Sequence, residues 1–157
     1  MMMKKRNIRL IVIHCTATSE QTAISSIQTY WKKVLHWRKP GYHYVVKANG
    51  EWVQLAMDHE MTNGVKGHNA NAIHVAYVGG IRTLKNGKTV ACDTRTEAQR
   101  KTLKHLVEKL KWMYPKVLVV GHRDLSPDLN GNGKIEPIEY LKMCPCFNAI
   151  DEYGGEH

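Results

Sequence analysis

Residues 8–14, IRLIVIH, form a short apolar run that is rich in β-branched side chains and ends in a histidine. Such a run predicts a buried strand. A second run of this kind, KVLVVGH at residues 116–122, also ends in a histidine. If the two strands are neighbours in one sheet, His14 and His122 emerge at the same edge, where a rigid backbone holds both imidazoles.

Helical and hairpin patterns separate these two runs. A helix is predicted over about residues 23–36, because apolar residues recur there at helical spacing. Residues 42–55, YHYVVKANGEWVQL, consist of two strand-like runs around Asn49–Gly50, the dipeptide of a tight hairpin. Residues 72–80, AIHVAYVGG, predict another central strand.

A second hairpin and a longer helix follow. Asn86–Gly87 predicts the hairpin turn, and Thr94 with Glu97 three residues later predicts a capping box that opens a helix ending near Tyr114–Pro115. Strands and helices interleave with hairpins, which favours an α/β fold with a mixed central β-sheet flanked by helices. A chain of 157 residues suits a single domain, and we expect that domain to span residues 1–157.

The composition excludes several classes of protein. Hydrophobic residues make up 43% and charged residues 24% of the chain, ordinary proportions for a globular protein. No apolar run approaches the roughly 20 residues that cross a bilayer, and the first residues lack a long apolar segment followed by a cleavage site. We therefore expect cytoplasmic synthesis without a signal peptide, and no membrane insertion.

The net charge of +9 favours anionic partners. Nucleic acid, an acidic membrane surface and an anionic cell-wall polymer all meet that condition. Four cysteines are too few for a disulfide scaffold, so free thiols or metal ligands are favoured. They are Cys15, Cys92, Cys144 and Cys146.

Histidine and cysteine side chains together predict a zinc site at one edge of the sheet. Two imidazoles, from His14 and His122, and one thiolate leave a fourth tetrahedral position for water, as in catalytic zinc sites. Zinc chemistry of this kind makes an amide attackable at neutral pH. Spacing leaves open whether Cys144 or Cys146 is the ligand. The alternative is a pair of hydrogen-bonded histidines at strand ends, together with buried thiols.

Five segments between residues 11 and 147 carry a resemblance to a known family: IVIHCTAT, GYHYVVKANGEW, NGVKGHNANAIHVAYVGGI, VVGHRDL and LKMCPCF. In this order they resemble the zinc-dependent N-acetylmuramoyl-L-alanine amidases of the phage T7 lysozyme type, relatives of the animal peptidoglycan recognition proteins. The resemblance implies hydrolysis of the bond between N-acetylmuramic acid and L-alanine, with peptidoglycan or muropeptides as the partner.

The resemblance also implies roles for individual residues. It makes Cys144 the thiolate ligand beside the two histidines, and it places Tyr42 and Lys142 at the non-ligand catalytic positions. A lysine ammonium suits the oxyanion that forms in amide hydrolysis. A phenol can orient the attacking water and help pass a proton to the leaving amine, and the principal base stays open.

In the family that this chain resembles, the loop before the strand at residues 72–80 helps line the substrate groove. This assigns substrate contact to His68, Asn69 and Asn71. The alternative is an ordinary surface turn, because Asn and Gly are also the residues that any loop favours.

Residues 128–139, DLNGNGKIEPIE, match the pattern of a calcium-binding loop and predict a second metal, Ca2+. The predicted ligands are Asp128, Asn130, Asn132, the Lys134 carbonyl and Glu139. The alternative is a Gly/Asn-rich turn before a short helix that starts at Pro137. The stretch belongs to an insertion at about residues 125–139 that the T7 type lacks.

Two rival functions differ in class from a zinc amidase. The first is a non-catalytic peptidoglycan-binding module of the same fold; such modules typically lack the ligand cysteine, whereas Cys144 is present. The second is a nucleic-acid-binding protein, which the charge alone suggests and no recognised motif supports. For the amidase itself, a phage or prophage lysis enzyme (endolysin) and a cytosolic wall-recycling enzyme both stay open.

Overall fold

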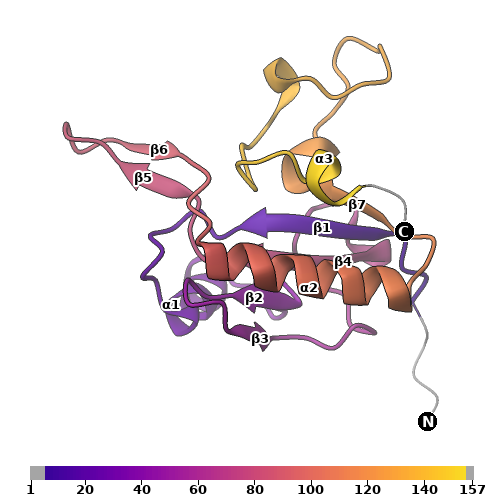
Figure 1. Ribbon diagram of the computed structural model, residues 1–157, viewed down its shortest axis with the longest axis horizontal. Helices are drawn as coiled ribbons and strands as arrows, with labels where there is room; N and C mark the ends of the chain where they lie inside the picture. Colours follow the sequence, from indigo (N-terminus) through magenta and orange to yellow (C-terminus); the bar gives the residue numbers. More distant parts are fainter. Residues whose placement is uncertain (1–5, 155–157) are drawn as a thin grey trace.

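The computed structural model describes residues 6–154 and shows an α/β fold around a mixed five-stranded sheet (Figure 1). The order across the sheet is β3-β2-β4-β1-β7. The strands are β1 (Leu10–Cys15), β2 (Tyr44–Val46), β3 (Trp52–Gln54), β4 (Ala72–Tyr77) and β7 (Leu118–Gly121). Strands β2, β4, β1 and β7 run parallel to one another, and β3 pairs antiparallel with β2. The predicted mixed sheet is confirmed.

The first and last of these strands are neighbours, which is the condition that the predicted zinc site required. β1 pairs in parallel with β7, and in this register Ile13 lies opposite Gly121. His14 and His122 each come one residue later, so both lie at the carboxyl edge of the sheet. A second, two-stranded sheet, β5 (Ile81–Thr83) with β6 (Thr89–Ala91), forms the hairpin that projects from the body in Figure 1.

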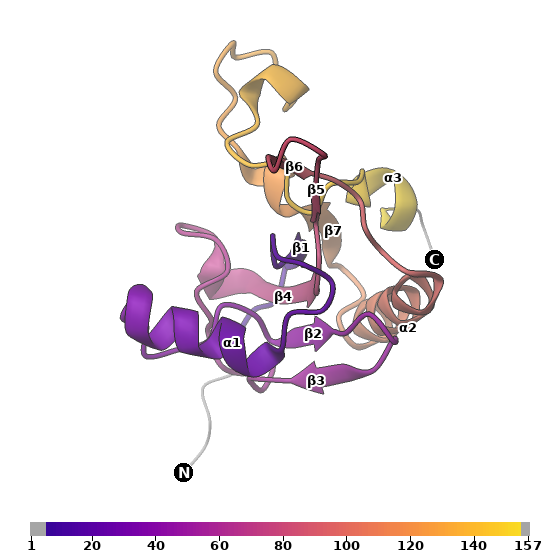
Figure 2. The same cartoon turned by 90° about the vertical axis from the view of Figure 1, so that its left-hand side faces the viewer.

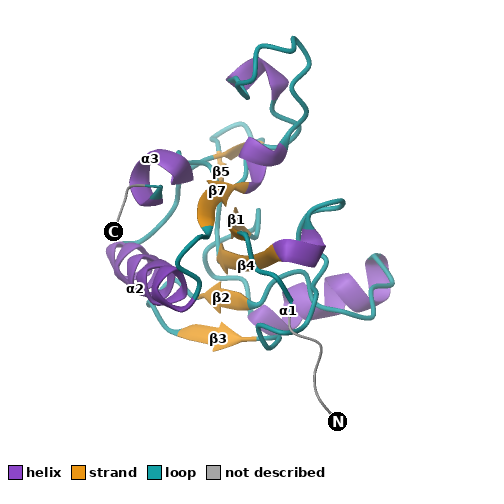
Figure 3. Ribbon diagram, turned by 90° about the vertical axis from the view of Figure 1, so that its right-hand side faces the viewer, coloured by secondary structure: helices purple, strands orange, loops and turns teal. Residues whose placement is uncertain are grey.

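Helices cover both faces of the sheet. α1 (Ile24–Thr29), which continues as a π-helical segment over Tyr30–Val34, lies on one side, and α2 (Glu97–Met113) lies on the other (Figures 2 and 3). α3 (Ala149–Tyr153) packs beside β7. Short 3-10 segments cover Asn69–Asn71, His122–Leu125 and Pro137–Glu139. Within residues 6–154, no helix has the length and apolar character needed to span a bilayer.

The capping box predicted at Thr94 and Glu97 is wrong by two residues. The N-cap of α2 is Thr96, whose Oγ1 accepts a hydrogen bond from the Gln99 N–H at 3.0 Å, while Gln99 Oε1 accepts one from the Thr96 N–H at 2.9 Å. Thr94 Oγ1 is used elsewhere, since it accepts a hydrogen bond from the Gly80 N–H at 2.8 Å. Both threonines precede a suitable N3 residue, so the tertiary contact of Thr94 decides between them.

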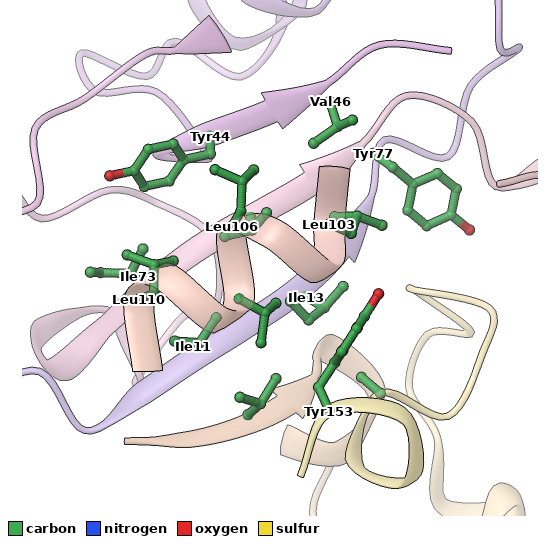
Figure 4. Close-up of a cluster of buried hydrophobic side chains, with 14 of the residues drawn as sticks. Ile11, Ile13, Tyr44, Val46, Ile73, Tyr77, Leu103, Leu106, Leu110 and Tyr153 are labelled. Carbon is green, nitrogen blue, oxygen red and sulfur yellow. The ribbon is translucent and has the colours of Figure 1, made fainter. Parts of the chain in front are cut away.

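The main core lies between α2 and the sheet (Figure 4). Leu103, Leu106 and Leu110 of α2 pack against Ile11 and Ile13 of β1, and all five side chains are buried. Burying this much apolar surface on β1 stabilises the strand in one position, because close-packed side chains leave little freedom to shift. His14 is thereby held on a rigid element.

Candidate metal centre and its cleft

Three predicted ligands lie together at the carboxyl edge of the sheet. One donor atom from each of His14, His122 and Cys144 lies within 4.8 Å of the other two. His14 Nδ1 is 3.9 Å from Cys144 Sγ, close to the roughly 3.6 Å that typical Zn–N and Zn–S bond lengths give in a tetrahedral site. Two imidazoles and one thiol are a donor set that suits zinc.

Hydrogen bonds to its backbone carbonyls hold the cysteine segment near the two histidines. The Arg123 N–H donates to the Cys144 carbonyl at 2.8 Å, and the Tyr77 hydroxyl donates to the Pro145 carbonyl at 2.6 Å. Gly121 allows this approach, because a Cβ at that position would lie 2.7 Å from Pro145 Cδ. The glycine before His122 is therefore required for packing between β7 and the cysteine segment.

The structure separates the two candidate cysteines. Cys144 Sγ accepts a hydrogen bond from the Cys15 N–H at 3.1 Å and faces His14. Cys146 Sγ instead lies 4.0 Å from Cys15 Sγ and 3.5 Å from the Gly80 carbonyl oxygen. Cys144 is thus the cysteine grouped with the histidines, as the resemblance implied.

Burial keeps the imidazoles at this edge neutral. It lowers the pKa of His14 well below the ordinary 6.5, with neighbouring histidines and Lys142 adding to the effect. The pKa of His122 falls to about 4, first through burial and then through the positive charge of Lys142. Neutral imidazoles have the free lone pair that a metal needs, so both side chains are ready to bind at neutral pH.

We expect the zinc-free protein to lose stability as the pH falls from 7 to 5. Burial lowers the pKa of His43 to about 4 and that of His74 to about 3, from an ordinary 6.5. Between these values the unfolded chain binds more protons, so the stabilisation is complete above pH 6.5 and is lost as the pH falls through this window. The two groups together lower the free energy of unfolding by roughly 4 kcal/mol between pH 7 and 5.

Urea denaturation of the zinc-free protein at both pH values measures this loss. His14 and His122, whose pKa values are also lowered, add to the measured loss. His74→Phe should therefore make the loss smaller by roughly 2 kcal/mol, whereas His105→Gln, a change at an exposed position of α2, should leave it intact. Equal unfolding free energies at pH 7 and pH 5 would show that these histidines are not held neutral by the fold.

A cleft of about 520 Å3 opens beside His122, one of the three donors. His122 and Lys142 both line it, so the predicted lysine lies on the same cleft as a predicted ligand. Trp37 and Leu141 supply apolar lining, and Lys66 adds a second positive charge. The cleft thus brings an apolar surface and two cations together with one of the predicted metal ligands.

Tyr42 lies beside His14, one of the three donors. Its ring centroid is 5.0 Å from that of His14, and its hydroxyl donates to the Cys15 carbonyl at 3.4 Å. Burial raises the pKa of the phenol well above 10, and the nearby Cys144 and Cys15 add to the effect. The hydroxyl therefore keeps its proton and can act as a hydrogen-bond donor beside His14.

The three residues predicted to contact substrate have different environments. Asn69 lines the cleft. His68 is exposed at the start of the 3-10 segment, and Asn71 is exposed with its amide donating to the Asn7 carbonyl at 2.7 Å. The side-chain oxygen of Asn69 is already hydrogen-bonded within the protein, because Oδ1 lies 2.8 Å from the Val65 nitrogen and 2.8 Å from His74 Nε2. Substrate contact by all three stays a prediction.

His74 has a contact with the metal centre that the sequence analysis missed. It lies within β4 and is fully buried, and its Nδ1 is 2.8 Å from His14 Nε2. A signal was present, since a histidine inside the apolar run AIHVAY must find a polar partner when it is buried.

The predicted calcium loop projects from the body beyond β7 (Figure 1). Asp128 accepts hydrogen bonds from the N–H groups of Gly131 at 2.9 Å and Gly133 at 2.7 Å. Pro137 opens the short 3-10 segment, as in the alternative interpretation of this stretch, and Glu139 at its end is only 3% exposed. Among the residues that the structure describes, Glu139 Oε1 has no hydrogen-bond partner.

Comparisons with known proteins relate this chain to an amidase family and to phage endolysins. A family model described as N-acetylmuramoyl-L-alanine amidase matches residues 4–138. An uncharacterized protein of Haemophilus influenzae is 51% identical over 85 residues, which cover 54% of this chain and 70% of that protein. The endolysin of Escherichia phage T7 is 32% identical over 142 residues, which cover 88% of this chain and 80% of the endolysin.

The fold is also found among solved structures. The Ph2119 endolysin from the Thermus scotoductus MAT2119 bacteriophage Ph2119 superposes with a TM-score of 0.69 at 23% identity. The superposition covers 99% of this chain and 90% of that endolysin. At this level of identity the likeness concerns the fold alone.

Proposed function

Because the chain belongs to the N-acetylmuramoyl-L-alanine amidase family, we propose that it is a zinc amidase acting on bacterial peptidoglycan or its soluble muropeptides. The bond cut is the amide between N-acetylmuramic acid and L-alanine. The observation that carries the proposal is the group of three metal donors, His14, His122 and Cys144, of which His122 lines a cleft together with Lys142. In this proposal the protein reaches the cell wall after its release from the cytoplasm.

Each residue has a distinct part in this reaction. Zinc, when bound by the three donors, supplies an activated water and polarises the substrate carbonyl. Lys142 stabilises the negative charge that develops on the carbonyl oxygen, because an ammonium in a cleft acts most strongly where charge appears. Tyr42 orients the attacking water, because its hydroxyl oxygen can accept a hydrogen bond while its proton is donated to the Cys15 carbonyl. The net charge of +9 favours approach to an anionic wall polymer.

Turnover separates this enzyme from a non-catalytic binding module. Zinc-loaded protein is incubated with a soluble muramoyl-peptide, and release of the peptide is followed by chromatography. We expect hydrolysis that stops when a chelator removes zinc and returns when zinc is added back. Tight binding of the muramoyl-peptide without any release would favour the binding module. Comparing rates on this fragment and on intact wall then distinguishes a recycling enzyme from a lysis enzyme.

A second metal, calcium, is part of the proposal for the loop at residues 128–139. The sequence supplies the ligand pattern, and the buried Glu139 carboxylate with one unpartnered oxygen supports it. A buried carboxylate oxygen needs a partner, and a cation is a suitable one. The predicted ligands include only two carboxylates, so we expect weak binding, with a Kd on the order of 1 mM.

Calcium is expected to raise the melting temperature without changing zinc content. At 10 mM calcium a site of about 1 mM affinity stabilises the fold by roughly 1.4 kcal/mol, which is a rise of about 3–5 °C for a protein of this size. Differential scanning calorimetry with and without calcium measures the shift, and Asp128→Ala should remove it. An identical melting temperature in both conditions would leave the loop as a plain turn.

A further inference from the structure

We propose that His74 and Asn69 are positioning residues that fix the tautomer and orientation of His14, so that His14 presents Nδ1 to the metal. The inference rests on the proposed function, because it concerns the same metal centre. It follows from the directions of three consecutive hydrogen bonds that lead from the cleft wall to the ligand.

The first bond determines how the Asn69 amide is oriented. The backbone N–H of Val65 points at the Asn69 side chain, with 2.8 Å between the two heavy atoms. A backbone N–H can only donate, so the side-chain atom that faces it is the oxygen, Oδ1. The same oxygen lies 2.8 Å from His74 Nε2. Since Oδ1 has no proton to give, His74 Nε2 must carry one and donate it.

The second and third bonds determine which nitrogen of His14 carries the proton. A neutral imidazole has one donor and one acceptor nitrogen, so His74 Nδ1 is the acceptor. His14 Nε2 lies 2.8 Å from His74 Nδ1 and must therefore donate its proton. His14 Nδ1 is then left with a free lone pair, and this is the nitrogen that faces Cys144 Sγ at 3.9 Å. In the other tautomer two lone pairs would meet at 2.8 Å, and a proton would occupy the metal-binding nitrogen.

Burial excludes water from the two imidazole rings. His14 is 1% exposed and His74 is 0% exposed, so solvent cannot provide a substitute partner for either ring. Ligand histidines in metalloproteins are commonly held in this way through the nitrogen that does not bind the metal. Here the partner is a second histidine whose own direction is set by an asparagine.

Gly64 provides the space that the His74 ring occupies. A Cβ at residue 64 would lie 2.3 Å from both Cγ and Nδ1 of that ring. Gly64→Ala therefore displaces the His74 ring without removing any polar group. It tests whether the position of the ring matters when its hydrogen-bonding nitrogens are still present. Its backbone lies outside the left-handed region, so alanine adds no backbone strain there.

The experiment measures zinc affinity by competition with a chelator of known strength, not turnover. His74→Phe keeps a ring but loses the acceptor, and Asn69→Leu keeps the side-chain size but loses the oxygen. Each should weaken zinc binding by about 10- to 100-fold, and Gly64→Ala should do the same. Asn69→Asp should stay near the wild-type affinity, because a carboxylate oxygen accepts from both Val65 and His74.

Two further measurements check the folding of the variants and the tautomer of His14. Thermal unfolding of each zinc-free variant shows whether it is folded at the temperature of the titration. Nitrogen-15 NMR of the zinc-free wild type reports the tautomer directly, and we expect the proton of His14 on Nε2. A proton on Nδ1 would overturn the proposal.

The positioning role would also be overturned if folded His74→Phe and Asn69→Leu bound zinc as tightly as the wild type, or if Asn69→Asp lost as much affinity as Asn69→Leu. Either result would leave the amidase proposal intact, provided that the wild type binds zinc and releases peptide. A wild type that binds no zinc would instead remove the proposed function itself.

Discussion

Replacing Cys144 by serine is expected to abolish stoichiometric zinc binding and to lower amidase turnover by roughly 10³-fold or more. A catalytic metal supplies several kcal/mol of transition-state stabilisation, and each 1.36 kcal/mol is a factor of ten in rate. Serine keeps the size of the side chain but is a poor zinc ligand. Two histidines alone do not complete the set of three protein ligands that catalytic zinc sites use.

Cys146→Ser is the matched control for this change. Cys146 is two residues from Cys144, but its sulfur faces Cys15 Sγ at 4.0 Å and not the histidines. Elemental analysis and turnover should therefore both stay near wild-type values in Cys146→Ser. Loss of zinc in Cys146→Ser with retention in Cys144→Ser would show that the cysteine grouped with the histidines is not the ligand.

Lys142→Ala is expected to keep the zinc and to lower kcat by about 10²- to 10³-fold, the usual effect of removing one donor to a developing oxyanion. The side chain lines the cleft together with His122, and its positive charge contributes to the lowered pKa values of His14 and His122. A charge this close to the metal centre can act on an oxygen that is bound there.

Lys66→Ala provides the comparison for Lys142→Ala. Lys66 lines the same cleft and carries the same charge, so its removal reports the general effect of one cation on substrate attraction. We expect a small rise in KM and little change in kcat for Lys66→Ala. If the two variants lost kcat equally, Lys142 would have no special part in the reaction.

Much of the fold could be predicted from local patterns. Two apolar runs that each end in histidine predicted two buried strands, and β1 pairs with β7 in a register that brings His14 and His122 to one edge. The hairpin around Asn49–Gly50 was also predicted correctly, and the short helix at Pro137 belongs to the alternative interpretation of residues 128–139. These features follow from side-chain periodicity and turn chemistry, which are readable over a few residues.

Features that depend on distant contacts could not be predicted. The choice of Thr96 over Thr94 as N-cap depends on a hydrogen bond from Gly80, and the separation of Cys144 from Cys146 depends on Cys15 and the end of β1. His74 looked like one residue of a buried strand, yet its partner is 60 residues away in sequence. Pairings of this kind become visible only when the strands are placed side by side.

Digestion of purified peptidoglycan, followed by mass spectrometry of the soluble products, tests the central claim most directly. The zinc-loaded protein is predicted to release stem peptides that begin with a free L-alanine amino group, and to leave glycan strands whose N-acetylmuramic acid carries a free lactyl carboxylate. Zinc-loaded, folded protein that releases no such peptides, or that cuts a different bond, would contradict the assignment of this site as an N-acetylmuramoyl-L-alanine amidase.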